Sequence, residues 1–188
     1  MLELNNQNFN HLKIHTQYSI CEGAIKIDNL KDFCKENKIP CLGLSDTSNL
    51  CGALEFAENI SKVGTQPIIG TQIYFRFEDT TGLLPLIALN EKGYKRIIEL
   101  SSRSYLENDA LSDPHLNIKE LFSNTEGILL LSGTIQGLFG KLFQKRRLDE
   151  VTSLYKSLSS KFHDKFYLEI QRHGDQNEIA FEKFNLEQ

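Results

Sequence analysis

The chain carries the stretch His11-Leu12-Lys13-Ile14-His15-Thr16-Gln17-Tyr18-Ser19-Ile20-Cys21-Glu22-Gly23 and, further on, Leu44-Ser45-Asp46-Thr47-Ser48-Asn49-Leu50-Cys51-Gly52-Ala53. Each stretch opens on a short apolar run that is typical of a strand. Each run is followed at once by a cluster of polar, titratable and glycine residues. A strand that delivers such side chains to a loop is typical of a site at the end of a β/α unit.

Composition indicates a soluble globular domain. The 188 residues are 40% hydrophobic and 24% charged, which is ordinary for such a domain and sufficient for a sizeable core. No apolar run approaches the roughly 18 residues of a membrane-spanning helix, and the polar start at residues 1–7 does not resemble a signal peptide. We therefore expect a cytoplasmic protein with no membrane partner.

The charge balance argues against a nucleic-acid-binding domain. With a net charge of −4, the overall field of the chain does not attract phosphate. A dense basic cluster is predicted to be a solvated helix end; it comprises Lys141, Lys145, Arg146 and Arg147. The four cysteines form no C-x-x-C pair, which favours reduced thiols over a zinc or disulfide framework. We expect little direct DNA binding by this domain.

Apolar strand-like runs alternate with amphipathic helical runs, a pattern that predicts β/α units around a parallel sheet. The predicted strands are 9–14, 41–44, 67–74, 83–89, 127–131 and 166–170. The first predicted helix has Asp28 as its N-cap and Leu30, Phe33 and Cys34 on its inner face, and the second covers 50–63 with Leu54, Ala57 and Ile60 on its inner face. Asn90 is predicted to cap a third helix, and a short fourth helix ends near Phe122. The remaining predicted helices cover 135–143, 148–158 and 177–186.

Polar residues recur at or just beyond the carboxyl ends of these strands. They are His15, Asp46, Gln72, Ser132, Glu169 and His173. In a β/α barrel such positions converge on one mouth, where an active site is built. The alternative is that they are ordinary polar turn residues, which often follow strands.

Five segments in succession resemble the motifs of PHP (polymerase and histidinol phosphatase) domains. They are residues 11–23, 45–56, 67–74, 131–133 and 167–174. Within that superfamily, the run 49–56 followed by 67–70 is similar to the version found in the alpha subunits of bacterial DNA polymerase III, and residues 90–94 fit the same group.

The resemblance implies a distorted (β/α)7 PHP barrel. The family's final strand, which carries an Asp-x-His ligand pair, lies beyond Gln188, so we expect a barrel that is incomplete at its C-terminus. Residues 1–188 would then be an N-terminal fragment of a much longer DNA-directed DNA polymerase chain that acts in DNA replication. The implied partners are the rest of the alpha chain and, in relatives, a proofreading exonuclease subunit. The magnesium ions of nucleotidyl transfer would belong to the parent polymerase.

Metal-binding PHP domains hold up to three ions with His, Asp and Glu ligands, which activate a water for attack on a phosphoester. In the first motif, the two ligand histidines of the family fall at Lys13 and His15, so one imidazole is lost. The ammonium of Lys13 would repel a dication. The motif's aspartate falls at Glu22, which keeps an oxygen donor on a longer side chain.

The later motifs also depart from the family's ligand set. The Asp-His pair of the second motif falls at Asp46 and Thr47, and the glutamate of the third falls at Gln72. His173 still matches a ligand position. The resemblance thus implies a degenerate metal site with no catalytic residue in this fragment, in which Lys13 replaces the charge of a metal by pairing with Glu22 and Asp46.

Two alternatives stay open. In the first, His15, Glu22, Asp46 and His173 still hold one zinc or manganese ion, and the domain is an active metal-dependent phosphoesterase or 3′–5′ exonuclease. In the second, it is a stand-alone phosphatase of the histidinol-phosphate type. The polymerase-type segments and the missing ligands disfavour the second alternative. The favoured hypothesis is a catalytically silent scaffold and docking domain without a cofactor of its own.

Overall fold

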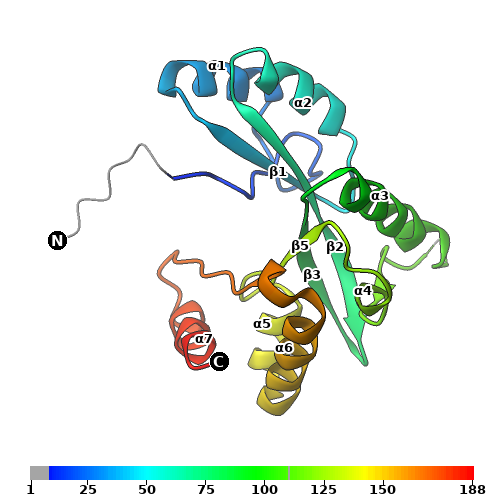
Figure 1. Cartoon of the computed structure of the whole chain (residues 1–188). Coiled ribbons are helices and arrows are strands. Elements are labelled where there is room, and N and C mark those ends of the chain that lie inside the picture. The colour runs from blue at the N-terminus through cyan, green and yellow to red at the C-terminus, as the bar shows by residue number, and fades with distance from the viewer. Residues whose placement is uncertain (1–8, 110) are drawn as a thin grey trace. The chain divides into compact units, whose positions relative to one another are not determined.

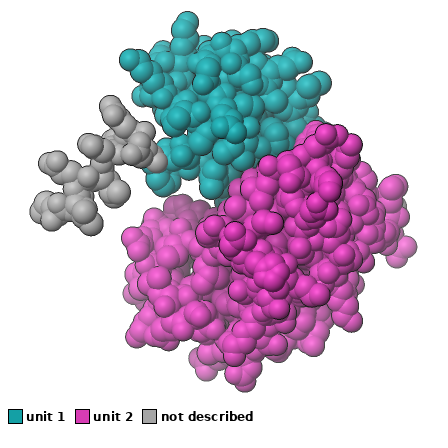
Figure 2. Space-filling model, viewed as in Figure 1, with its two compact units in different colours: residues 1–71 teal, residues 72–188 magenta. Residues whose placement is uncertain are grey.

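A computed structural model of the protein describes residues 9–109 and 111–188 (Figure 1). The polar start at residues 1–7 and Ala110 lie outside the described residues. The chain divides into two compact units, Met1–Thr71 and Gln72–Gln188 (Figure 2). Each unit is described by itself below.

Six strands and seven α-helices make up the described ranges. The strands are β1 (Cys41–Thr47), β2 (Gln66–Phe77), β3 (Thr80–Ala88), β4 (Leu116–Asn117), β5 (Ile128–Leu131) and β6 (Phe166–Tyr167), hydrogen-bonded in the order β1-β2-β3-β5-β6 with β4 paired to β2. The helices are α1 (Ile27–Asn37), α2 (Ala53–Ser61), α3 (Glu91–Leu106), α4 (Glu120–Ser123), α5 (Leu138–Gln144), α6 (Leu148–Phe162) and α7 (Gln176–Leu186), with the 3-10 helix η2 at His163–Lys165.

The core of the first unit lies between β1 and the helices α1 and α2, which lie side by side in Figure 1. Its buried residues are Ile27, Leu30, Cys34, Leu42, Leu44, Ala53, Phe56 and Ile60. Two predicted inner residues are wrong, because Phe33 is 45% exposed and Leu54 is 71% exposed. Helix α2 begins at Ala53 rather than near Leu50, so the inward face falls on Ala53, Phe56 and Ile60.

The start of α1 also differs from the prediction. Its N-cap is Lys26, and Asp28 lies inside the first turn. A carboxylate there still faces the positive end of the helix dipole, which explains why the sequence signal placed it near the N-terminus.

The predicted strand over 9–14 is an extended segment that pairs with β1 through an isolated parallel bridge between Ile14 and Leu44. Ile14 N donates to Gly43 O at 3.0 Å, and Gly43 N donates to His11 O at 2.7 Å. The segment runs so close to β1 that a Cβ on Gly43 would lie 2.4 Å from Leu12 O. Glycine at position 43 is therefore what admits the neighbouring backbone.

The second unit is built on a hairpin. Strands β2 and β3 are joined by Glu78 and Asp79 alone, a shorter connection than the predicted strand bounds of 74 and 83 imply. Glu78 takes the left-handed conformation at φ +52°. A connection this short fits only antiparallel neighbours. Strand β3 also pairs with β5 in antiparallel register, whereas β5 and β6 are parallel. The prediction of a parallel sheet is therefore wrong for the middle of the sheet.

The basic cluster of the second unit holds the hairpin turn. Lys141 Nζ donates to Thr81 O at 2.9 Å, and Lys145 Nζ donates to Thr80 Oγ1 at 2.7 Å. Arg147 binds the carboxylates of Glu78, Asp79 and Glu150. The prediction of a merely solvated helix end is wrong for Lys141, Lys145 and Arg147, because their partners come from a hairpin far away in the sequence.

Helix caps and aromatic contacts complete the second unit. Asn90 caps α3 as predicted, since its Oδ1 accepts from Gly93 N at 3.0 Å. Helix α7 packs on α5 through the ring of Phe143, which contacts Phe181 and Phe184 at centroid distances of 5.2 and 5.3 Å. No described helix is long and apolar enough to cross a membrane.

Candidate functional site

Asp46 is the centre of the polar cluster in the first unit. It is 0% exposed, and it lies inside β1 rather than after it. Its Oδ1 accepts from Thr16 N at 2.6 Å and from Ser19 Oγ at 2.8 Å, and its Oδ2 accepts from Thr16 Oγ1 at 2.7 Å. Three of the roughly four lone-pair positions of a carboxylate are thus occupied by donors from the chain. We call Asp46, Thr16 and Ser19 the Asp46 hub.

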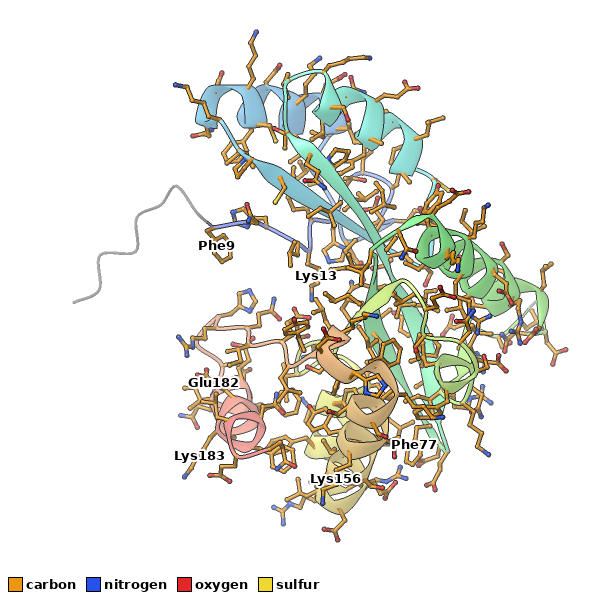
Figure 3. All side chains as sticks on the ribbon, in the orientation of Figure 1. Phe9, Lys13, Phe77, Lys156, Glu182 and Lys183 are labelled. Carbon is orange, nitrogen blue, oxygen red and sulfur yellow. The ribbon has the colours of Figure 1, made fainter. Side chains whose placement is uncertain are left out.

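The expected partner of this carboxylate was the Lys13 ammonium. Two hydroxyls and a backbone amide donate to it at the distances given above. These short groups reach a fully buried oxygen without bringing a second charge out of water. Lys13 lies on the segment that precedes Ile14 (Figure 3).

Ser19 connects the hub to His15. Its hydroxyl donates to Asp46 and accepts from Thr47 N at 3.0 Å, and His15 Nδ1 lies 3.3 Å from the same oxygen. Because the serine proton is used on Asp46, a hydrogen bond between these two atoms requires His15 Nδ1 as its donor. Ser19 is 0% exposed and stands between the histidine and the aspartate, so this is not the order of a nucleophilic triad.

Glu22 and Thr47 form the outer edge of the cluster. Thr47 Oγ1 donates to Glu22 Oε2 at 2.5 Å, and His15 Nδ1 lies 3.9 Å from that same oxygen. The side chain of Glu22 is 43% exposed. Four of the predicted positions, His15, Glu22, Asp46 and Thr47, are therefore brought together in one unit.

A second layer of hydrogen bonds fixes the two loops. Thr71 Oγ1 lies 2.6 Å from Asp46 O and 3.0 Å from Asn49 O, within donating reach of both. Asn49 Nδ2 donates to Tyr18 O at 2.9 Å, and Tyr18 OH donates to Glu55 Oε2 at 2.6 Å. The hydrogen bond to Glu55 raises the pKa of the Tyr18 phenol. The loops stay locked although Ser48 takes the left-handed conformation at φ +58°.

Two predicted positions belong to the second unit. Gln72 lies within β2 and is 6% exposed, rather than at the end of that strand. His173 lies just before α7, where its backbone N donates to Glu178 Oε2 at 2.7 Å and its Nδ1 lies 2.9 Å from Glu178 Oε1. The hydrogen bonds from His173 hold the pKa of the Glu178 carboxyl below its usual range.

Over residues 9–109 and 111–188, no three His, Cys, Asp or Glu side chains gather in a way that would hold a metal ion. Sequence reasoning missed Thr16 and Ser19 as partners of Asp46. Both lie in the first quoted stretch, and only the fold reveals that their hydroxyls point at the aspartate of the second.

The remaining histidines lie elsewhere. The His11 ring stacks edge-on against Phe9 at 4.7 Å, and His115 Nδ1 contacts Asp113 O at 2.7 Å. His163 ends α6 at φ +53°.

Comparison with known proteins places the chain in a family. The family model described as the PHP domain matches residues 11–173. Since this match covers most of the chain, the protein belongs to the PHP domain family.

Curated relatives narrow the group. The chain is 36% identical over 191 residues to a DNA polymerase III subunit alpha of Caulobacter vibrioides, covering 97% of this chain and 17% of the relative. It is 34% identical to the same subunit of Rickettsia felis (88% and 14%) and 33% identical to that of Thermus aquaticus (88% and 15%). The chain thus spans only 14–17% of the length of these relatives.

A solved structure with a similar fold is that of a protein from Bifidobacterium adolescentis assigned as a metal-dependent phosphoesterase. It aligns with a TM-score of 0.57 at 12% identity and covers 95% of this chain and 83% of that one. The likeness shows a mixed α/β fold similar to that of this structure.

Proposed function

We propose that this PHP domain is a catalytically silent scaffold and docking domain of a replicative DNA polymerase alpha subunit. The observation that carries the proposal is the Asp46 hub, where Thr16 and Ser19 supply the donors to a fully buried carboxylate. A dication at this position would have to displace donors that the chain already provides.

The replaced ligand positions support the same proposal. A catalytic ion needs about four to six donors, mostly from the protein. Lys13, Thr47 and Gln72 stand where the family resemblance puts ligands, and none of the three supplies a carboxylate or an imidazole.

The parent context is part of the proposal. The relatives are DNA polymerase III alpha subunits, so the rest of such a chain is the partner that we propose, and the nucleotidyltransferase activity and its magnesium ions would lie outside residues 1–188. A proofreading exonuclease subunit is a second proposed partner. A cytoplasmic location fits a replication protein and stays a prediction.

The finer fold belongs to the proposal as well. We infer a distorted (β/α)7 barrel, and the similarity to the Bifidobacterium structure supports this inference. Of the positions that the resemblance assigns to the degenerate metal site, the first unit contains Lys13, His15, Glu22, Asp46 and Thr47, and the second contains Gln72 and His173.

The alternative function is an active phosphoesterase or 3′–5′ exonuclease that uses one zinc or manganese ion. The proximity of His15 and Glu22, at 3.9 Å, favours it. Its ligands would be His15, Glu22, Asp46 and His173.

Metal content separates the two functions. Protein purified without chelator is incubated with excess zinc or manganese, desalted and analysed by plasma mass spectrometry. We expect far less than one equivalent retained, and no hydrolysis of a single-stranded oligonucleotide or of p-nitrophenyl phosphate with either metal present. A tightly held equivalent that disappears in His15→Ala but not in the control His115→Ala would overturn the silent-scaffold proposal.

A further inference from the structure

A small cavity lies in the second unit, where α7 meets the segments that follow β5 and β6. Its wall is formed by Thr134, Ile135, Glu169, Ile170, Gln171, Glu178, Phe181, Glu182 and Asn185. Figure 3 marks Glu182 on α7. The space open to the centre of a water-sized sphere is about 10 Å³, which is about what one water molecule needs.

One buried group on this wall has no partner among the described residues. Asn185 is 2% exposed, and its Nδ2 makes no hydrogen bond there. The other end of the amide is engaged, because Asn185 Oδ1 accepts from Tyr155 OH at 2.9 Å. A buried NH2 group of this kind requires an acceptor.

The same wall carries carboxylates that already accept hydrogen bonds. Glu178 accepts two hydrogen bonds from His173, and Glu182 binds Arg172 through both of its oxygens. Each oxygen keeps a further lone pair for a weak donor. The wall thus offers one unused donor group beside several acceptors.

A metal ion does not suit this arrangement. Among the described residues no three His, Cys, Asp or Glu side chains gather in a way that would hold one, and the Glu182 carboxylate is already paired with Arg172. A molecule that both accepts and donates hydrogen bonds, and that is no larger than water, satisfies the wall.

We propose that this cavity is a binding site for one ordered water molecule, which accepts from Asn185 Nδ2 and donates to the carboxylates of Glu169 and Glu178. Glu169 is itself fixed near the end of β5, because its backbone N donates to Ser132 Oγ at 2.9 Å. The water therefore joins α7 to the polar residues that follow β5 and β6.

A crystal structure of the whole chain at a resolution that shows ordered water tests the site directly. We expect a water peak about 3 Å from Asn185 Nδ2 and from a carboxylate oxygen. The proposal is overturned if Nδ2 binds a carboxylate directly, or if the amide is reversed and a metal ion occupies the cavity.

A solution measurement keeps the test independent of crystals. In the wild-type chain, we expect a cross-relaxation peak between the Asn185 side-chain amide and a long-lived water. The exposed Asn177 amide, on the same helix, should show only rapidly exchanging solvent.

Variants extend the comparison. Asn185→Leu should lower the melting temperature by several degrees, whereas Asn177→Leu should change it little. If Asn185→Leu fails to fold, the wild-type spectrum still decides, because a solvent signal at Asn185 like that at Asn177 excludes the bound water.

Discussion

The Asp46 hub and the ion-pair cluster of Arg147 with Glu78, Asp79 and Glu150, which we call the Arg147 cluster, hold segments of the chain together in opposite ways. Each connects segments distant in sequence through carboxylates, but Asp46 is fully buried and held by neutral donors, whereas Arg147 gathers three carboxylates at the surface. Asp79, one of the Arg147 partners, has a side chain that is 71% exposed.

The difference indicates that the number of charges in an electrostatic contact does not determine how much the contact contributes to the free energy of unfolding. Water screens the Arg147 cluster and solvates its members whenever the contact opens. In the Asp46 hub, no water replaces a lost acceptor, so each broken hydrogen bond leaves a buried group unsatisfied. We therefore expect the single carboxylate to matter more than the larger ionic cluster.

The largest loss of stability is expected for Asp46→Ala. It strands Thr16 N and the hydroxyls of Thr16 and Ser19, and we expect a loss of about 3 kcal/mol or more in the free energy of unfolding. Asp46→Asn keeps an acceptor for two of these donors and should lose about 1 kcal/mol. Urea denaturation of both variants measures the difference.

The matched control is Asp32→Ala, which removes an exposed aspartate of α1 in the same unit. We expect it to stay within about 0.5 kcal/mol of wild type. Equal losses at Asp46 and Asp32 would mean that the hub does not hold the two loops together.

Gly23→Ala tests whether the geometry of the hub depends on close backbone packing. A Cβ at position 23 would lie 1.9 Å from Thr16 O, so the loop that carries Ser19 has to shift. We expect a loss of about 2 kcal/mol by chemical denaturation.

Gly64→Ala separates this clash from backbone strain. Gly64 has φ +82° and open space where a Cβ would be placed, so its substitution meets only the conformational cost, about 1 kcal/mol. A Gly23→Ala variant no less stable than Gly64→Ala would contradict the packing argument.

Arg147→Met should cost less stability than Asp46→Ala or Gly23→Ala. Its effect should also depend on salt and pH, which distinguishes the Arg147 cluster from the Asp46 hub. We expect a small fall in melting temperature that shrinks further in 1 M salt, where about 3 Å of screening length remains. Lys156→Met, on the exposed side of α6, is the control. The loss at Asp46→Ala should be nearly independent of salt.

The pH dependence of the Arg147 variant follows from Asp79. Hydrogen bonding from Arg147, with a contribution from Thr80, lowers the pKa of the Asp79 carboxyl. A lowered folded-state pKa gives stability that is present above the unfolded value of about 4 and is lost as pH falls through the folded value. The gap between wild type and Arg147→Met should therefore be constant near neutrality and close below about pH 4. A gap that widens in acid would refute this assignment.

Local sequence signals predicted the elements but not every pairing. The buried strand Ile128–Leu131 and the Asn90 cap were predicted because each depends on neighbouring residues alone. The antiparallel middle of the sheet was not predicted, because it depends on a two-residue turn at Glu78 and Asp79. These charged residues differ from the Asn-Gly pair that usually indicates such a turn.

For the candidate site, the sequence predicted which residues lie near one another better than it predicted which hydrogen bonds they form. Family resemblance selected His15, Glu22, Asp46 and Thr47, and the fold brings these four together. The partners of Asp46 were not predicted, since serine and threonine hydroxyls are common in any loop and nothing in their spacing marks the two that face a buried carboxylate.

The Asp46 hub bears on whether folding of the first unit depends on the supply of metal ions. Its loops are joined by donors that are encoded in the chain and therefore present from the moment of synthesis. Under the silent-scaffold proposal, assembly of this corner needs no trace element, so scarcity of zinc or manganese in a cell would leave it intact and a chelator would not destabilise it.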